Sequence, residues 1–384
     1  MNRIILKFIV AIYCISPILL LNGCKSKQET KPELPSAYVF SNEKILPVTS
    51  VKNQSKSGTC WSFATVSFLE SELLREGKGE YDLSEMFPVY YSYISKAVKK
   101  IRRHGNSAAD QGGQAHDVLN VIRNYGIVPE SVYAGMPKGD SIHNHSAMAN
   151  SLKECLQTIL SNKKIPENWI NNYRQYLDAH LGIPPQTFEY DGKTYTPLEF
   201  AQSFINVDDY VELTSYGCYP FYEKTILEIP DNWSNDLYYN LPIDDFMKVI
   251  DYALENGYTL VWDGDVSEKG FSHKNCIAIA PIEQVENLFS AIREEYNVDD
   301  SLRQKTFDSY ETTDDHLMHL VGTSTDNNGK KYYIIKNSWG TNRNACSGFL
   351  HMSEAFVRLK TVAIMVNKKS IPENIAEKSG IKIK

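Results

Sequence analysis

The spacing of apolar positions predicts that the first part of the chain is helical. Between residues 60 and 77 apolar side chains recur at helical spacing, at Phe63, Val66, Phe68, Leu69, Leu73 and Leu74. Residues 83–98 and 114–125 have similar patterns, and Gly126 supplies a stop signal for the second of them. Further helices are expected within 141–183 and at 198–211, 243–256 and 282–293.

The later part of the chain has short runs rich in apolar and aromatic residues, which predict strands. The runs cover residues 258–263, 275–279, 316–324, 331–337, 348–353 and 361–366. Asp326-Asn327-Asn328-Gly329 is a strong turn signal between two of them. A helical half followed by a β-rich half predicts an α+β fold with two lobes, and residues 138–250 are expected to form a largely helical insertion.

Residues 54–64, Gln-Ser-Lys-Ser-Gly-Thr-Cys-Trp-Ser-Phe-Ala, have the local chemistry of a cysteine nucleophile at a helix N-terminus. Gly58 permits a tight turn before Cys60, and the helix dipole and free N–H groups would stabilise a thiolate there. The Gln54 amide and the Cys60 backbone N–H could together hold a developing oxyanion. The alternative is a buried structural thiol, which the residues around Cys60 disfavour.

Two downstream segments supply a base and a residue to orient it. His316, which follows Asp315, could take the thiol proton, and Asn337 could accept the other imidazole N–H. Trp339 would then shield the His–Asn hydrogen bond from water. His319 is a second candidate base, but residues 316 and 319 face opposite sides of a strand. We therefore predict His316 as the base and expect His319 to be a surface histidine or one satisfied by a partner.

Taken together, these motifs resemble the papain-like cysteine peptidases. The matching residues occur in the family's order, at Gln54, Gly58, Cys60 to Ala64, Leu83-Ser84-Glu85, Gly112-Gly113, Asp315-His316 and Asn337-Ser338-Trp339-Gly340. Residues 110–114, 121–129 and 261–266 are similar to the bleomycin hydrolase or aminopeptidase C subfamily. The resemblance implies a papain-like fold, with a helical lobe and a β-rich lobe, and hydrolysis of peptide substrates.

The resemblance also implies a substrate-binding role for four further residues. In the family, glycines at the positions of Gly112 and Gly113 let a substrate backbone lie against the enzyme as an added strand, which requires that no Cβ intervenes. The alternative is that the two glycines merely end a loop. Trp61 and Trp339 are predicted to line the site and also to pack as core aromatics.

A cysteine aminopeptidase is the expected activity, on the strength of the resemblance. In the subfamily a C-terminal arm lies in the cleft, its carboxylate meets the free amine of the substrate, and most members form hexamers. Residues 373–384 are the candidate arm, with Lys384 supplying the carboxylate, and a homo-oligomer is a possible assembly. An endopeptidase of the same fold and a non-catalytic peptide-binding lipoprotein remain as alternatives.

The first 23 residues resemble a bacterial lipoprotein signal. Arg3 and Lys7 precede a mostly apolar stretch over 8–21, and Cys24 follows a small residue. We expect removal of residues 1–23 and lipidation of Cys24. The alternative is an ordinary signal peptide followed by a chance cysteine.

The expected mature protein is therefore an exported lipoprotein that reaches the membrane through its N-terminal lipid. A polar tether over 24–37 would connect the lipid to a peptidase domain over 38–372. Exported proteins can form disulfides, and four cysteines are left for pairing, with the connectivity open: Cys155, Cys218, Cys276 and Cys346.

Composition narrows the possible partners. The chain has 384 residues, 42% of them hydrophobic and 23% charged, with a formal net charge of −7. These values are typical of a globular protein with a large core and give no sign of a nucleic-acid-binding surface. The basic run at 99–104 is predicted to be a solvated helix face. No cysteine or histidine grouping has the spacing of a structural zinc site, and no metal or organic cofactor is expected.

Overall fold

A computed structural model of the protein describes residues 36–136, 139 and 141–383. The predicted signal peptide, Cys24 and the tether up to residue 35 lie outside the described residues, and so does Lys384. The chain from Ser36 onward forms one compact unit. Within the described ranges no helix is long and apolar enough to cross a membrane.

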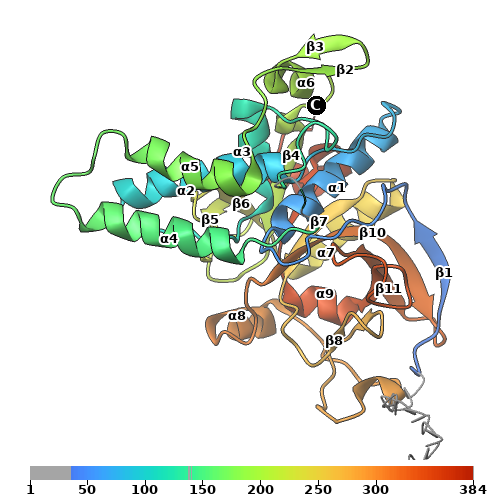
Figure 1. Ribbon diagram of the computed structural model, residues 1–384. Helices are drawn as coiled ribbons and strands as arrows, with labels where there is room; N and C mark the ends of the chain where they lie inside the picture. The colour runs from blue at the N-terminus through green and yellow to red at the C-terminus, as the bar shows by residue number, and fades with distance from the viewer. Residues whose placement is uncertain (1–35, 137–138, 140, 384) are drawn as a thin grey trace, which may run out of the picture. The chain divides into compact units, whose positions relative to one another are not determined.

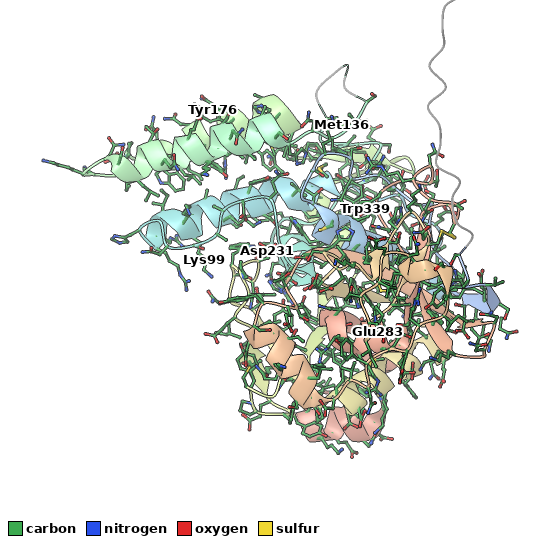
Figure 2. All side chains as sticks on the ribbon, turned by 90° about the horizontal axis from the view of Figure 1, so that it is seen from below. Lys99, Met136, Tyr176, Asp231, Glu283 and Trp339 are labelled. Carbon is green, nitrogen blue, oxygen red and sulfur yellow. A yellow bond between two sulfur atoms is a disulfide. The ribbon has the colours of Figure 1, made fainter. Side chains whose placement is uncertain are left out.

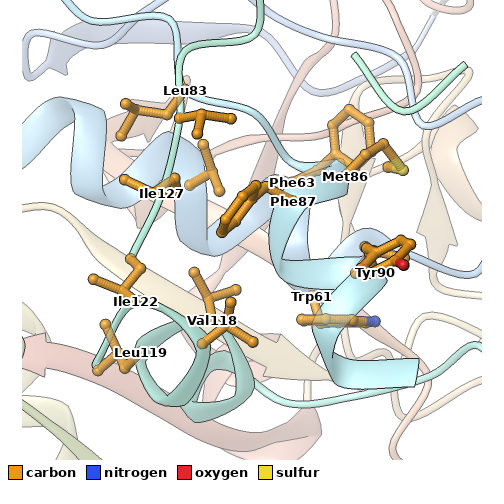
Figure 3. Close-up of a cluster of buried hydrophobic side chains, with 14 of the residues drawn as sticks. Trp61, Phe63, Leu83, Met86, Phe87, Tyr90, Val118, Leu119, Ile122 and Ile127 are labelled. Carbon is orange, nitrogen blue, oxygen red and sulfur yellow. The ribbon is translucent and has the colours of Figure 1, made fainter. Parts of the chain in front are cut away.

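Three helices pack around one hydrophobic core in the first part of the chain, as predicted. They are α1 (Cys60–Arg75), α2 (Met86–Arg102) and α3 (Ala115–Tyr125). Figure 3 shows apolar side chains from all three meeting in this core, including Phe63 of α1, Phe87 of α2 and Val118 of α3. Helix α1 is buried along most of its length, because it packs against α2 and α3 on one side and the sheet on the other. This packing fixes the position of Cys60, the first residue of α1.

A large mixed sheet forms the second lobe. Its strands are β1 (Phe40–Ile45), β4 (Tyr210–Thr214), β5 (Lys224–Ile226), β6 (Leu237–Asn240), β7 (Leu260–Gly264), β8 (Phe271–Ser272), β9 (Ile277–Ala278), β10 (His316–Asp326), β11 (Lys331–Lys336), β12 (Phe349–Ser353) and β13 (Thr361–Asn367). Their order is β5-β6-β4-β13-β7-β10-β11-β12-β9-β8, and β1 pairs with β10. The predicted strands at 316–324, 331–337, 348–353 and 361–366 are all present.

The two faces of this sheet bury different cores. Helix α1 packs on the face that carries Val261 and Leu317. The opposite face carries Trp262 and Met318, and a second core there includes residues of α7 (Ile243–Glu255) and α9 (Glu354–Lys360). Alternate residues of β7 and β10 therefore serve alternate cores, as the period of two along a strand requires.

Residues 138–250 add helices to the first lobe and strands to the second. Helices α4 (Ser146–Ser161) and α5 (Trp169–Leu181) lie alongside α2 (Figure 1). A hairpin of β2 (Phe188–Tyr190) and β3 (Lys193–Tyr195) leads into α6 (Pro197–Gln202). Strands β4, β5 and β6 then extend the main sheet beyond β13. The segment is thus partly built into the sheet as well as packed on the helical lobe.

Two helix predictions are wrong. Residues 198–211 contain most of the short α6, the 3-10 turn η1 (Val207–Asp209) and the start of β4, because Tyr210 pairs with the distant Asn367 of β13. Residues 282–293 contain only the 3-10 turn η2 (Leu288–Ser290). The helix in this part of the chain, α8 (Asp300–Asp308), begins later, where the Asp299 side chain accepts a hydrogen bond from the backbone N–H of Leu302.

The C-terminal segment packs far from the start of α1. After β13 come η3 (Lys368–Ser370) and α10 (Glu373–Ser379), and Ile375 and Ile381 are buried in the second core. The side chain of Asn367, at the end of β13, donates a 2.6 Å hydrogen bond to Glu72. Glu72 lies about 18 Å along α1 from Cys60, given the rise of a helix. The described part of the tail is therefore at the opposite end of α1 from the predicted nucleophile.

Candidate active site

The Cys60 thiol lies at the N-terminus of α1, against the strand that carries His316. Its side chain is 9% exposed, and the backbone N–H of Leu317 donates a hydrogen bond to the sulfur. The turn before the helix is held by Gly58, whose N–H donates to Oε1 of Gln111 at 2.9 Å. A Cβ at residue 58 would meet the Gln111 side chain at 2.9 Å, so a glycine is required there.

The resting site does not favour the thiolate that the helix position suggested. Burial raises the pKa of the Cys60 thiol to about 12; the Leu317 N–H opposes this, and the nearby carboxyl groups of Asp263, Asp314 and Asp231 add to it. In this water-poor, acidic setting the thiol is neutral. The helix N-terminus alone does not offset the loss of hydration.

His316 and Asn337 form the predicted pair. His316 begins β10, Asn337 follows β11, and the two antiparallel neighbours bring Nε2 of His316 within 2.9 Å of Oδ1 of Asn337. The Trp339 ring packs on the His316 ring at a tilt of 32°, with centroids 4.9 Å apart. Burial lowers the pKa of His316 to about 4, although the Asn337 hydrogen bond favours the charged form. The imidazole is thus neutral, with its Nε2–H held by Asn337 and its Nδ1 left to accept a proton.

His273 is a residue of this site that the sequence analysis did not find. Its Nδ1 lies 3.3 Å from Nδ2 of Asn337, and its ring meets Trp339 edge-on at 4.9 Å. A neutral His273 can accept from the Asn337 amide nitrogen, which fixes the amide oxygen toward His316. The Cys276–Cys346 disulfide holds the loop that carries His273 to the segment after Trp339. Only the tertiary structure brings these residues together.

His319 occupies the opposite face of β10, as predicted. It is fully buried, and its Nδ1 lies 2.8 Å from Oγ of Ser67 on α1. The Lys336 ammonium also donates to Ser67, at 2.7 Å. His319 is therefore a buried histidine that faces α1 and has Ser67 as its partner, whereas the partner of Asn337 is His316.

Gln54 stands beside the nucleophile turn with part of its amide already engaged. Its Nε2 donates to the carbonyl oxygen of Ser57 at 2.8 Å, and its Oε1 accepts from the Ser338 hydroxyl at 2.6 Å. An amide nitrogen carries two hydrogens, so one N–H of Gln54 remains for a ligand. The Ser338 contact ties Gln54 to the segment that carries Asn337.

The two glycines and Trp61 form one structural unit beside the thiol. The Trp61 indole N–H donates to the carbonyl oxygen of Gln111 at 3.0 Å and so anchors the glycine segment. A Cβ at Gly113 would lie 3.0 Å from the Trp61 ring, and one at Gly112 would collide with the Asp231 carboxylate. Trp61 is only 1% exposed and packs against Gly113, and its predicted role in substrate binding stays a prediction. Trp339 is half-buried and covers His316.

The remaining cysteines and histidines form no metal centre within the described residues, where no group of three or more potential ligands meets. Cys276 and Cys346 are paired, while Cys155 and Cys218 are free thiols. The sequence left this pairing open. His143 and His145 lie near each other, with ring centroids 5.8 Å apart, and no third ligand joins them.

Comparisons with known proteins find a matching family, related sequences and a similar solved structure. The model of the Peptidase C1-like family matches residues 20–383. The chain is 25% identical to aminopeptidase G of Lactobacillus delbrueckii subsp. lactis, covering 88% of this chain and 85% of that protein. It is 24% identical to aminopeptidase C of Streptococcus thermophilus, covering 90% and 86%. The crystal structure of PepW from Lactobacillus rhamnosis superposes with a TM-score of 0.70 at 22% identity, over 88% of this chain and 84% of PepW.

Proposed function

Because the chain belongs to the Peptidase C1-like family and is a cysteine peptidase of papain-like fold, we propose that Cys60 is its nucleophile, His316 its base and Asn337 the residue that orients the base. The observation that carries the proposal is the 2.9 Å His316–Asn337 hydrogen bond next to a thiol at a helix N-terminus. Both reacting groups are neutral at rest, so the thiol has to give its proton to His316 in the course of the first step.

In the first step Sγ of Cys60 bonds to the carbonyl carbon of the substrate while its proton passes to Nδ1 of His316. The carbonyl oxygen becomes an oxyanion, which the free N–H of Gln54 and the Cys60 backbone N–H stabilise, an effect of about 3–4 kcal/mol per donor elsewhere. The imidazolium then protonates the leaving amine, and the C–N bond breaks to leave a thioester. Water, deprotonated by His316, hydrolyses the thioester and returns the proton to the thiol.

We propose that the activity is that of an aminopeptidase. The names of the relatives support this, and so does the loop at residues 231–236, which lies against Gly112 and would obstruct a chain running further along the glycines. A peptide with a free N-terminus can end at this loop. Peptides are the proposed substrates.

An endopeptidase is the second candidate, and the position of the tail favours it. The arm expected in the cleft is instead packed into the second core as far as Ile381. Products of a long unblocked peptide distinguish the two activities, since an aminopeptidase releases single residues from one end.

We also propose that the protein is exported and lipidated at Cys24. The Cys276–Cys346 disulfide supports export, because disulfides persist in oxidising compartments. Cys24→Ser should move the protein from the membrane fraction to the soluble fraction. Wild-type protein that stays soluble with residues 1–23 intact would contradict the proposal.

The direct test of the chemistry is Cys60→Ala, assayed on a panel of fluorogenic aminoacyl substrates. We expect a loss of about 10⁴-fold or more in kcat/KM with an unchanged thermal transition. Cys218→Ala is the matched control, because Cys218 is an exposed free thiol on the surface. Turnover retained in Cys60→Ala would overturn the proposed mechanism.

A further inference from the structure

The loop at residues 231–236 is held firmly across the glycine segment. The Trp233 indole N–H donates to Oδ2 of Asp117 on α3 at 2.8 Å. Lys99 of α2 donates to the carbonyl oxygen of Ser234 at 2.6 Å. Asp236 accepts from Asn120 at 3.0 Å. These contacts with two helices of the first lobe make the loop a fixed wall of the site.

Asp231 presents an unpaired carboxylate at the foot of this wall. Its oxygens lie so close to the backbone of Gly112 that no Cβ fits between them. Within the described residues it has neither a hydrogen bond nor an ion pair. Figure 2 labels Asp231 beside helices α2 and α3. A carboxylate half-buried without a partner is costly unless a ligand completes it.

Two more deeply buried carboxyl groups, those of Asp263 and Asp314, lie near Asp231. Asp263 of β7 is 2% exposed, and its carboxyl group meets no donor from the described residues other than the Asp314 carboxyl. It pairs across the sheet with Leu317, so its side chain leaves the sheet on the face where Cys60 lies. Asp314 accepts from Nε2 of Gln114 at 2.8 Å. Burial and mutual repulsion raise the pKa of both carboxyl groups, so that the pair retains a proton.

A buried cation, Lys96, lowers the pKa of Asp231 through its charge but forms no ion pair with these carboxyl groups. Lys96 of α2 directs its ammonium at the backbone carbonyl oxygens of Asp110 and Gly112 and makes no ion pair with Asp231. It lies over the rings of Trp61 and Trp233, with Nζ 5.7 and 5.9 Å from the ring centroids. The site is therefore left with an excess of negative charge beside the nucleophile.

We propose that Asp231, with Asp263 and Asp314 behind it, binds the α-ammonium group of the substrate and makes the loop at 231–236 the determinant of aminopeptidase specificity. The inference rests on the proposed function. An ammonium group donates three hydrogen bonds, which suits the Asp231 carboxylate, which lacks a donor, and the Asp263–Asp314 pair beside it. It would also replace the proton that the Asp263–Asp314 pair now shares. The substrate amine is then selected by a side-chain carboxylate on this loop.

A bound ammonium also changes the nucleophile. Asp231, Asp263 and Asp314 each oppose the Cys60 thiolate, and a positive charge among them would cancel that effect. Free-amine substrates should therefore gain in kcat as well as in KM over blocked ones. A loop that acted only as a steric stop would change KM alone.

The test compares Asp231→Asn with Asp191→Asn, the same change at an exposed residue in the turn between β2 and β3. The substrates are alanyl-aminomethylcoumarin and its N-acetylated form. In Asp231→Asn we expect kcat/KM for the free amine to fall about 10- to 100-fold, while the value for the acetylated form stays within a few-fold. Asp191→Asn should preserve the wild-type ratio. An unchanged ratio in Asp231→Asn would overturn the inference.

A second measurement needs no variant and applies if Asp231→Asn does not fold. L-Alaninamide and L-lactamide differ in an ammonium group against a hydroxyl group, and each is tested as an inhibitor of wild-type hydrolysis of the acetylated substrate. We expect alaninamide to inhibit at a concentration at least about 10-fold lower. Equal potency would contradict the amine site. Loss of the amine preference with Cys60 still essential refutes only this inference, whereas turnover in Cys60→Ala refutes the proposed function.

Discussion

The two sides of the cleft treat their polar groups in opposite ways. On the reactive side, His316, Asn337 and Gln54 have hydrogen-bond partners, and both His316 and Cys60 are neutral. On the glycine side, which we call the acidic side, Asp231 lies against Gly112 without a hydrogen-bond donor among the described residues, and Asp263 meets only the Asp314 carboxyl. The first side is complete before substrate arrives. The second is unsatisfied, which is what a binding site for a charged group requires.

This contrast explains why a buried thiol with a raised pKa is compatible with catalysis. Burial, with a smaller contribution from the carboxyl groups of the acidic side, raises the pKa of the thiol and keeps it neutral until substrate binds. The reactive side needs no reorganisation, since the His316 ring is already clamped between Asn337 and Trp339. Chemistry and selection are therefore carried by different residues, and different variants should separate them.

The largest effect is expected when the proposed base of the reactive side is removed. His316→Ala should reduce kcat/KM by about 10³-fold or more on both free and acetylated substrates, because members of a catalytic unit are non-additive. His319→Ala is the control on the other face of the same strand. It should change kcat/KM by less than about 10-fold while lowering the free energy of unfolding by about 1–3 kcal/mol, since Ser67 loses a buried partner. The reverse ranking would mean that His319 is the base.

The next effect is the pH dependence of the preference for free-amine substrates, which we attribute to the acidic side. Burial raises the pKa of Asp231 to about 6; Lys96 opposes this, and Asp110 and Asp117 add to it. Below this pKa Asp231 is neutral, so the preference for free over acetylated substrate should fall as the pH drops from 7 to 5. The charged and titratable groups that face Asp231 are Lys96 from α2, Asp110 and Asp117 from the glycine segment and α3, and Asp314, Asp263 and Cys60 beyond them.

In Asp231→Asn the ratio of the two kcat/KM values should not vary across this pH range. The substrate amine, with an ordinary pKa near 8, limits the preference at the alkaline end. A wild-type ratio that is constant between pH 5 and 7 would show that no carboxylate with this pKa selects the amine.

A smaller effect tests whether the C-terminal tail takes part in catalysis or in selection of the substrate amine. Ile381→Ala should lower the free energy of unfolding by about 2–4 kcal/mol, because Ile381 is 5% exposed in the second core. The ratio of free-amine to acetylated turnover should stay as in the wild type. Urea denaturation and the two-substrate assay check these points. A change in the ratio without a loss of stability would indicate that the tail lies in the cleft and contacts the substrate.

The smallest effect concerns the support of the reactive side. Replacing both Cys276 and Cys346 with Ser removes a disulfide with a sequence separation of 70 and should cost about 2–4 kcal/mol of stability. Because the loop with His273 is then freed, kcat should fall modestly while the free-amine preference persists. Full retention of kcat and stability would mean that the disulfide does not support the Asn337 region.

The reactive side could be read from the sequence because each of its parts lies in a short motif with its own chemistry. Cys60 and Gln54 lie six residues apart, and His316 and Asn337 lie in strands whose alternation is clear. The strands at 331–337 and 361–366 were predicted within about a residue for the same reason. The hydrogen bond between His316 and Asn337 follows once these strands are neighbours.

The acidic side could not be read in this way. Asp231 lies in a loop without periodicity, more than 100 residues from Gly112, and only the packing of Trp233 and Lys99 on the helical lobe brings it there. The same limit accounts for the start of β4, which was predicted as helix, because its partner β13 lies about 150 residues later. Local propensity does not report such long-range pairing.

The most direct test of the account is a titration of the native enzyme with iodoacetamide, in which peptide mass mapping of each cysteine is compared with residual hydrolysis. Within the described residues Cys60, Cys155 and Cys218 are free, and Cys218 is exposed, so the surface thiol serves as an internal control. The account predicts that activity falls in one-to-one proportion with modification of Cys60 and is unaffected by modification of Cys218. Full activity in enzyme whose Cys60 is completely alkylated, or loss that follows Cys155 or Cys218 instead, would contradict it.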